Sequence, residues 1–480
     1  MLVINSVSTE DSLYLWWEKP LEKVDVYSLY INERLLATTK KTHYTISSLH
    51  PESKYFVSIK YDDKIVSLTL ETKKSKKRID ITSAPYFVKG DGKTVNTLAI
   101  QRALNDLDEN TLLYFPKGEY LTGALRIKSN SHLYLEDGAI IQGSAKKEDY
   151  LPLIPSRFEG LERLCYSSLI NIGEMDHNKG YETENVSIMG KGTISSGGKE
   201  LAWDIIESEK IKLKDYLNEN KKLVEECEKL ETIPGRIRPR LINISNAKNV
   251  HISGLTLKNG ASWMVHILYS DNVITDHCTF YSEGVWNGDG WDPDSSTNCI
   301  LYCCSFHTED DSVAIKSGKN PEGNIINRPS KHIRVFDCKS YSGHGIIIGS
   351  EISGGIEDIM FWDNDLTFSS NGYEIKSTWK RGGYVKDVLI LDSIAPKILL
   401  HSVPYNNDGE PSKVKPIIKN IKIKNLLLDN PNNQEAIIEV IGFDKGNKME
   451  NISLSNITIS SLTKPIIKLE NANVEVDLHS

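Results

Sequence analysis

The sequence predicts an all-β chain: a right-handed parallel β-helix, preceded by a small N-terminal β-sandwich and interrupted by a helical insertion. Two patterns lead to this prediction. Most of the chain repeats one unit, namely a polar residue, a short β-branched strand, a Gly or Asn turn and a second short strand. Residues 1–72 instead alternate apolar and polar in short runs. At 480 residues the chain is about three times a typical 150-residue domain, so it has room for both parts.

Residues 1–72 are spaced like the strands of a small antiparallel sandwich, and no long helix fits there. The turn that ends at Pro51, followed by Tyr55, resembles the tyrosine corner of a fibronectin type III domain. Trp16 or Trp17 would then be the buried aromatic residue of that domain. A generic β-sandwich is the alternative interpretation.

We expect the basic residues 73–79 to form an exposed linker, and residues 80–480 to form the β-helix domain. Thr97 can cap a helix at the start of that domain, because apolar residues follow it at helical spacing. This helix would cover the first coil of the solenoid.

The repeated units predict the β-helix. From Asn249 onward their first residues are separated by 23, 26, 34, 26, 29, 33 and 31 positions. A strand-turn-strand unit cannot bury its own apolar face, so it must stack on copies of itself. Leucine-rich repeats need an L-x-x-L-x-L frame that is absent, and propeller blades need longer repeats with four strands each. Inward-facing Val, Ile and Leu would form a continuous core.

Residues 203–231 break the repeat. Their apolar positions fall at helical intervals among charged residues, so a helical insertion leaves the solenoid here. Insertions on one face of a solenoid often shape its binding face. A surface decoration without a role is the alternative.

Composition restricts the partners and the compartment. Basic and acidic residues number 57 and 65, a net charge of −8, so neither nucleic acid nor a membrane is an expected partner. The seven cysteines fit neither a zinc spacing nor a dense disulfide framework, and we expect reduced thiols. The N-terminus lacks a leader pattern, which predicts a cytoplasmic protein, or a secreted or periplasmic one if a leader was removed.

Carboxylates are concentrated in two Gly-rich turns. Asp310 and His344 each lie twelve residues into their units, so they should be neighbours in successive coils. The turn that holds Asp289 is five residues longer, which would project Asp289 toward Asp310. Asp289, Asp310 and Asp311 then converge with His344 and Lys376. Close carboxylates raise at least one pKa, which suits acid/base hydrolysis.

Two other interpretations of these turns stay open. Asp and Asn are common turn residues, so the cluster could be a set of Asx-turns with a bound cation. Calcium-dependent β-elimination, as in pectate lyases, uses the same fold with an arginine base. No arginine lies between Asp289 and Asp311, which counts against elimination.

Four motifs in order resemble glycoside hydrolase family 28, the polygalacturonases. They are N-x-D at 287–289, D-D at 310–311, G-H-G at 343–345 and x-I-K at 374–376. The resemblance extends over about residues 80–480. The segment S-G-H-G-I-I-I-G-S-E, together with K-R-G-G-Y, is most similar to the exo-acting branch, which trims galacturonate from chain ends.

The resemblance implies hydrolysis with inversion of configuration. Asp310 would be the general acid, and Asp289 and Asp311 would activate the attacking water. His344 would hold the protonation and geometry of the acid, and Lys376 would bind a substrate carboxylate. The resemblance implies no metal or organic cofactor.

One position departs from the family. The motif is usually R-x-K, but here it begins with Glu374, which replaces a cation expected to hold the sugar on the leaving-group side. A uronate in that subsite is therefore in doubt, unless cations such as Lys316 or Arg381 compensate. Asn287 and His266 complete the candidate substrate-binding residues.

These observations support three hypotheses for function. The first is an inverting exo-polygalacturonase that releases galacturonate from the non-reducing end of oligogalacturonides. The second keeps the same machinery but cleaves galacturonate from rhamnose or another neutral sugar, as in rhamnogalacturonan or xylogalacturonan. The third, a non-catalytic carbohydrate-binding protein, has no need of three close carboxylates. All three predict a pectic oligosaccharide as partner, and the oligomeric state is not predicted.

Overall fold

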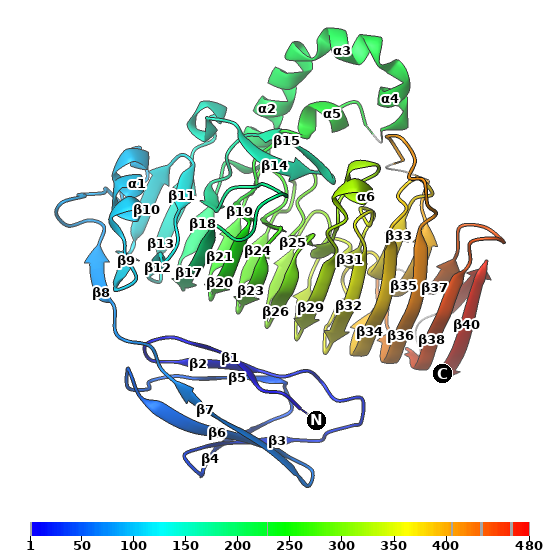
Figure 1. Ribbon diagram of the computed structural model, residues 1–480, viewed down its shortest axis with the longest axis horizontal. Helices are drawn as coiled ribbons and strands as arrows, with labels where there is room; N and C mark the ends of the chain where they lie inside the picture. The colour runs from blue at the N-terminus through cyan, green and yellow to red at the C-terminus, as the bar shows by residue number, and fades with distance from the viewer. Residues whose placement is uncertain (1, 228, 405–406, 433–434, 461–463, 480) are drawn as a thin grey trace. The chain divides into compact units, whose positions relative to one another are not determined.

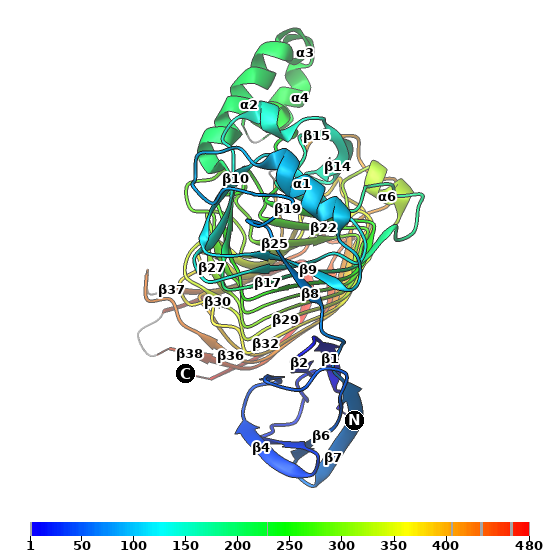
Figure 2. The same cartoon turned by 90° about the vertical axis from the view of Figure 1, so that its left-hand side faces the viewer.

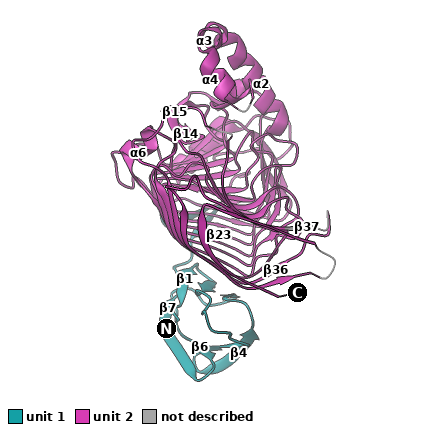
Figure 3. Cartoon of the chain, turned by 90° about the vertical axis from the view of Figure 1, so that its right-hand side faces the viewer, with its two compact units in different colours: residues 1–79, 108–112 teal, residues 80–107, 113–480 magenta. Residues whose placement is uncertain are grey.

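The computed structural model describes residues 2–227, 229–404, 407–432, 435–460 and 464–479. The chain divides into two compact units, shown in two colours in Figure 3. Unit 1 comprises residues 1–79 and 108–112, and unit 2 comprises residues 80–107 and 113–480.

Unit 1 is a β-sandwich of two antiparallel sheets. Its three-stranded sheet contains β1 (Asn5–Ser8), β2 (Leu13–Trp16) and β5 (His43–Ile46). Its four-stranded sheet contains β3 (Tyr27–Ile31), β4 (Arg34–Thr39), β6 (Lys54–Tyr61) and β7 (Lys64–Glu71). Trp17 is the central buried aromatic residue, edge-on to Tyr27 at 5.1 Å between ring centroids. The His50 N–H donates to the Tyr55 hydroxyl (2.9 Å), the contact expected of a tyrosine corner. The assignment to fibronectin type III itself stays a prediction.

Unit 2 is a parallel β-helix, which confirms the predicted fold (Figures 1 and 2). Successive coils contribute strands to three parallel sheets of 7, 11 and 13 strands among the described residues. The 11-stranded sheet contains β11 (Leu125–Ile127), β16 (Ile170–Ile172), β19 (Ile242–Ser245), β22 (Val265–Leu268), β25 (Trp291–Asp294), β28 (Val313–Ile315), β31 (Gly345–Ile348), β33 (Gly372–Ser377), β35 (Lys397–Ser402), β37 (Glu435–Ile441) and β39 (Lys464–Glu470).

The other two sheets complete each coil. The 13-stranded sheet contains β8 (Lys77–Asp80), β9 (Thr111–Phe115), β12 (His132–Leu135), β17 (Thr183–Gly190), β20 (Ala247–Ser253), β23 (Asp271–Asp276), β26 (Thr297–Tyr302), β29 (Ser330–Phe336), β32 (Ile356–Trp362), β34 (Tyr384–Ala395), β36 (Ile417–Leu428), β38 (Met449–Ile459) and β40 (Ala472–His479). The 7-stranded sheet contains β10 (Gly118–Thr122), β13 (Ala139–Gly143), β18 (Thr193–Ser195), β21 (Thr256–Lys258), β24 (Thr279–Tyr281), β27 (Ser305–His307) and β30 (Lys339–Ser340). Residues 77–79 of the predicted linker are therefore part of an edge strand.

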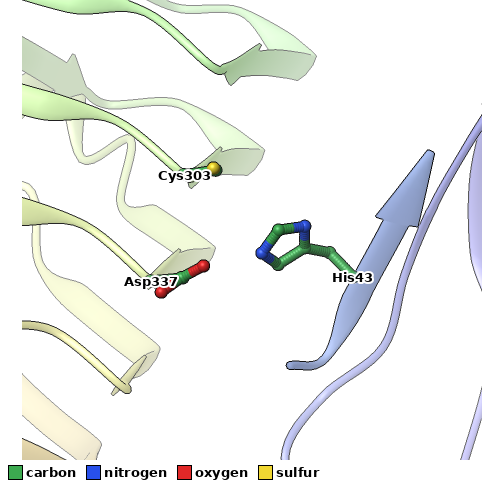
Figure 4. A group of neighbouring side chains, drawn as sticks. All are labelled: His43, Cys303 and Asp337. Carbon is green, nitrogen blue, oxygen red and sulfur yellow. The ribbon is translucent and has the colours of Figure 1, made fainter. Parts of the chain in front are cut away.

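The polar residue that begins each unit has a structural reason. Asn249, Asn272 and Asn298 have φ of 57°, 53° and 53°, in the left-handed region that Asn tolerates better than most residues. The side chains also bond from coil to coil, since Asn272 Nδ2 donates to Asn249 Oδ1 (2.8 Å). The turns after β26 and β29 repeat this conformation at Cys303 and Asp337, which lie in successive coils in Figure 4.

Helices in the described part of unit 2 lie on the first coil, in the insertion and in two further short segments. Helix α1 (Thr97–Asp106) buries Ile100, Ala103 and Leu104 and packs on the first coil, as predicted. The prediction that Thr97 caps this helix is wrong: the N-cap is Asn96, and Thr97 Oγ1 accepts a bond from Gly123 N–H (2.7 Å). The insertion predicted over 203–231 is helical, but it begins earlier and is divided into one helix of 15 residues and three short ones. These are α2 (Gly198–Lys212), α3 (Lys214–Glu219), α4 (Lys221–Glu226) and α5 (Thr232–Gly235). Unit 2 also contains the 3-10 helix Lys147–Tyr150 and α6 (Glu322–Ile326).

The free thiols agree with the expectation of reduced cysteines. All seven cysteines are free, and five of them are buried. None of the described helices is long and apolar enough to cross a membrane.

Stacked rings in the core give a test of the solenoid packing. Phe336 is buried between Tyr302 and Trp362, with ring centroids at 5.1 and 4.2 Å. We expect Phe336→Ala to lower the free energy of unfolding by about 3–5 kcal/mol, because it leaves a cavity in two coils. Urea denaturation followed by fluorescence measures this. Phe368→Ala, at a ring that is 45% exposed, is the control and should change it by less than about 0.5 kcal/mol. Equal losses in both variants would contradict the packing argument.

Candidate active site

Three turns of successive coils meet at one edge of the 11-stranded sheet. Asp289 lies just before β25, Asp310 and Asp311 just before β28, and His344 just before β31. Backbone bonds hold the turns in register. Gly290 N–H donates to Asp311 O (2.9 Å), and His344 N–H donates to Asp310 O (3.0 Å). The predicted neighbours are thus brought together.

His344 is bound between two carboxylates. Its Nδ1 lies 3.1 Å from Asp310 Oδ1 and 2.9 Å from Asp311 Oδ1. These hydrogen bonds raise the pKa of His344 to about 11, so the ring is an imidazolium at neutral pH. Burial opposes ionisation of Asp310, but the His344 bond and charge outweigh it and hold the pKa of Asp310 below its usual range. One proton is therefore shared within this trio.

The same trio has the donor set of a small cation site. Ligand atoms of Asp310, Asp311 and His344 lie within 4.8 Å of one another. An imidazolium has no free lone pair for a metal, and its charge already compensates the two carboxylates. In this protonation state the trio is built to hold a proton. The side chains of His344 and Asp310 are 38% and 25% exposed, so this proton is accessible.

Asp289 has the opposite electrostatic character. It is buried, and its Oδ2 lies 3.3 Å from Lys316 Nζ. Burial raises the pKa of Asp289 well above its usual range, and the charges of Asp310 and Asp311 add to this, while Lys316 opposes it. Within the described chain, Asp289 Oδ1 has no hydrogen-bond partner. This oxygen is therefore an acceptor that no described group uses.

Asp292 is a buried carboxyl that the sequence analysis missed. In the part of the chain that the structure describes, neither of its carboxyl oxygens has a hydrogen-bond partner. Burial and then the charge of Asp289 raise the pKa of Asp292 well above its usual range. Strand alternation could have indicated it: Trp291 points inward to Thr275, so the next residue faces the site.

Lys376 and Glu374 come from β33. Lys376 Nζ lies 3.8 Å from Asp311 Oδ2 and 3.6 Å from Glu374 Oε2. Glu374 is buried, with Oε1 at 2.6 Å from His401 Nε2, and it accepts a bond from Asn371 Nδ2 (3.0 Å). Burial alone would raise its pKa, but His401 and Lys376 lower the pKa of Glu374 to about 2. The carboxylate is therefore ionised and paired within the protein.

Asn287 contacts a buried cation. Its Oδ1 accepts a bond from Arg238 Nη2 (2.6 Å), and the guanidinium carbon of Arg238 lies 4.5 Å from the Trp286 ring centroid. Burial lowers the pKa of Arg238 to about 9. The sequence analysis assigned Arg238 no role, because nothing in a lone arginine indicates its burial. Asn287 therefore orients Arg238.

The other two predicted binding residues lie inside the wall of the site. His266 has no exposed surface, and its Nε2 lies 3.4 Å from Asp294 Oδ2. Burial lowers the pKa of His266 to about 4, so the ring is neutral. Arg381 is also fully buried, and it donates to Asn320 Oδ1 (2.6 Å). Both side chains support the wall; the structure gives neither an exposed face for a sugar.

A hairpin packs against Trp263, next to the site. Its strands are β14 (Ile154–Phe158) and β15 (Leu161–Cys165). Arg157 Nη1 binds Asp294 Oδ1 at 2.8 Å, and both side chains are fully buried. Phe158 stacks on Trp263 at 5.0 Å, and Lys316 Nζ lies 4.7 Å from the same Trp263 ring. The hairpin is thus anchored directly beside Lys316.

The raised pKa of Asp292 has a consequence for stability. Between its ordinary value of 3.8 and its raised folded value, the folded state retains a proton that the unfolded state loses, so this group's contribution falls as pH rises. We expect Asp292→Asn to raise the free energy of unfolding at pH 7 by about 0.5–2 kcal/mol. The gain should shrink toward pH 4. Urea unfolding at several pH values measures this.

Asp294→Asn is the matched control, two residues along the same strand. It breaks the buried pair with Arg157 and should lower the free energy of unfolding by about 3–5 kcal/mol at pH 7. A gain for Asp292→Asn that does not change with pH would contradict the proposed titration.

Known proteins similar to this chain point to one family. The model of glycosyl hydrolases family 28 matches residues 173–477. A probable polygalacturonase of Vitis vinifera is 30% identical over 393 residues, 78% of this chain and 73% of the relative. A Thermotoga maritima exopolygalacturonase structure superposes with a TM-score of 0.70 at 26% identity, over 84% of this chain and 90% of that one. A family 28 exopolygalacturonase of Yersinia enterocolitica has the same fold, with a TM-score of 0.76 at 21% identity and 99% of both chains covered. This chain belongs to glycosyl hydrolases family 28.

Proposed function

We propose that this chain is an exo-acting, inverting glycoside hydrolase that releases galacturonate units from the non-reducing end of oligogalacturonides. The observation that carries the proposal is that a proton donor and an unused acceptor occur in one site. Asp310, Asp311 and His344 hold a proton between them, and Asp289 Oδ1 has no hydrogen-bond partner among the described residues. Hydrolysis with inversion needs one group to donate a proton and another to activate water. The likeness to the Thermotoga maritima exopolygalacturonase supports the substrate class.

The proposed reaction uses these groups in one step. Asp310 is ionised in the free protein; it takes the proton that His344 Nδ1 holds 3.1 Å away and passes it to the glycosidic oxygen as the bond to the anomeric carbon breaks, which leaves His344 neutral. Asp289 takes a proton from the attacking water, assisted by Asp311, and the water oxygen bonds to the opposite face of the anomeric carbon. Asp289 must be ionised for this step, and the charge of Lys316 favours its ionised form.

The hairpin packed beside the site supports the exo action. Hairpin β14–β15 is anchored next to Lys316 by the Arg157–Asp294 pair and the Phe158–Trp263 stack. A polysaccharide chain cannot continue through packed side chains, so only a chain end fits against this wall. Lys376 is placed to bind the carboxylate of a galacturonate ring by charge-assisted hydrogen bonds.

A second candidate keeps the chemistry but changes the leaving sugar. Glu374 stands where the family motif has arginine, and it is ionised beside Lys376. An anionic side chain there disfavours a uronate on the leaving-group side and favours a neutral sugar such as rhamnose. This candidate is a hydrolase of galacturonate linked to a neutral sugar in branched pectin.

Product analysis tests the proposed function. We expect the wild type to release monomeric or dimeric galacturonate from linear oligogalacturonides, followed by chromatography over time. Asp310→Asn should lower kcat by about 100-fold or more, because it removes the proton donor. Asp137→Asn, at an exposed carboxylate outside the site, is the control and should be unchanged. Internal cleavage into long fragments would contradict the exo assignment, and no cleavage would contradict hydrolysis of this substrate.

Glu374→Gln distinguishes the two candidates. If the carboxylate repels a uronate leaving sugar, the substitution should raise kcat/KM on linear oligogalacturonides about tenfold, equal to about 1.4 kcal/mol, and leave rhamnogalacturonan oligomers unchanged. Glu439→Gln is the matched control, since Glu439 binds the other nitrogen of His401 (2.9 Å). An equal change in both variants would show that His401, and not the charge of Glu374, is responsible.

A further inference from the structure

The turn that carries Asp289 is longer than the β-ladder can hold. It has five residues more than the turn that carries Asp310. At its start, Ser282 N–H donates to His307 O (3.0 Å). At its end, Met264 N–H donates to Asp289 O (2.8 Å). The extra residues between these ends have no counterpart in the next coil. Contacts from outside the ladder must therefore hold the segment that leads to Asp289.

Arg238 supplies buried contacts to this segment. Its Nη1 donates to Trp286 O (2.7 Å), and its Nη2 donates to Asn287 Oδ1 (2.6 Å). Gly284 N–H also donates to Glu309 Oε2 (2.8 Å), but that bond is exposed, whereas Arg238 is fully buried. A guanidinium is a rigid fork that fixes two acceptors relative to each other, and a lysine ammonium is a point charge on a flexible stem. Arg238 therefore fixes two of the three residues that precede the proposed base.

Arg238 also bonds to the end of the helical insertion. Its Nε donates to O of Gly235, the last residue of α5 (2.9 Å), and its Nη1 donates to Ala261 O in the loop before β22 (3.3 Å). A Cβ at position 235 would lie 3.0 Å from the Trp286 ring and 3.3 Å from Arg238 Nε, so a glycine permits this close approach. Lys229 Nζ lies 5.3 Å from the centroid of the same ring. The insertion thus packs on the turn that leads to Asp289.

We propose that Arg238 is a positioning residue of the reaction: it fixes the turn that carries Asp289, and it makes the helical insertion part of the structure that positions this base. The role rests on the proposed function, in which Asp289 takes a proton from the attacking water, whereas the contacts of Arg238 do not. A displacement of about 1 Å in a reacting group can cost about 100-fold in rate. The insertion therefore serves the reaction and is more than a surface decoration.

The test compares Arg238→Lys with Arg240→Lys in the full chain. Arg240 is the matched control: it is also buried, and the guanidinium carbons of Arg238 and Arg240 lie 5.2 and 4.3 Å from the same Phe158 ring. Its guanidinium donates to Arg238 O (2.7 Å) and to Arg157 O, outside the turn. On linear oligogalacturonides, Arg238→Lys should lower kcat about 10- to 100-fold and leave KM within about twofold, because only the base is displaced. Arg240→Lys should lower the urea midpoint to a similar extent but change kcat less than about twofold.

Amide hydrogen exchange, followed by mass spectrometry, gives a readout that needs no activity. We expect the peptide 282–290 to exchange about tenfold faster in Arg238→Lys than in the wild type, and at the wild-type rate in Arg240→Lys. Gly235→Ala disturbs the same contacts from the insertion, so it should speed exchange of this peptide and lower kcat about threefold with KM unchanged. Gly180→Ala is its control, since an added methyl group there meets no other atom of the described chain within 4 Å.

The outcomes separate this proposal from the proposed function. Unchanged exchange of peptide 282–290 in Arg238→Lys would show that Arg238 does not hold the turn and would overturn the proposal. Faster exchange with an unchanged kcat, or an equal loss of kcat in Arg240→Lys, would overturn the positioning role. A wild type that cleaves no pectic substrate would overturn the proposed function, while exchange would still decide whether Arg238 holds the turn. Gly235→Ala adds one methyl group, so it keeps the test decisive even if Arg238→Lys fails to fold.

Discussion

The in-register stacking of parallel coils is the constraint on which the rest of unit 2 depends. Each coil adds strands about 4.8 Å from the last, so residues at equivalent positions touch although 20 to 35 residues separate them in sequence. Backbone bonds from Gly290 to Asp311 and from His344 to Asp310 fix this register at the site. A slip of one residue would turn every side chain of a strand to the other face. The backbone hydrogen bonds between coils therefore hold the catalytic side chains in fixed relative positions.

Burial and pairing give the carboxyls of the site two different ionisation states. Asp289 and Asp292 have few compensating partners, so the free protein favours their protonated forms. Asp310 has the imidazolium of His344 beside it and is ionised. Such a site costs stability, because close buried carboxyls repel and are poorly solvated. The stacked aromatic rings and long β-ladders of the solenoid offset that cost in stability. They also fix the backbone, so that Asp289 and Asp292 cannot move relative to Asp310.

Features that depend on the repeat period and on residue type, such as the β-helix and the neighbouring Asp310 and His344, could be predicted from the sequence. Features that depend on the length of each coil and on burial could not. The repeated Asn, Asp and His at unit starts indicated the β-helix, because they occupy left-handed turns that stack from coil to coil. Equal offsets brought Asp310 and His344 together. No local signal could place hairpin 154–165 beside Lys316 or show that His266 and Arg381 are enclosed. The insertion is not one continuous helix: α2 buries six residues, whereas α3 and α4 bury none.

The replacement at Glu374 illustrates why one changed residue cannot be judged alone. In the register of the sheet, Lys376 pairs with His401 of the next coil, which brings the imidazole to Glu374. A line of alternating charge then crosses the coils, and each contact in it is 3.8 Å or less: Asp311, Lys376, Glu374, His401, Glu439 and Lys468. Glu374 is thus neutralised on two sides before any sugar binds. Glu374 therefore repels a uronate leaving sugar less than an unpaired glutamate in place of arginine would. This weaker repulsion favours the linear oligogalacturonide over the branched substrate.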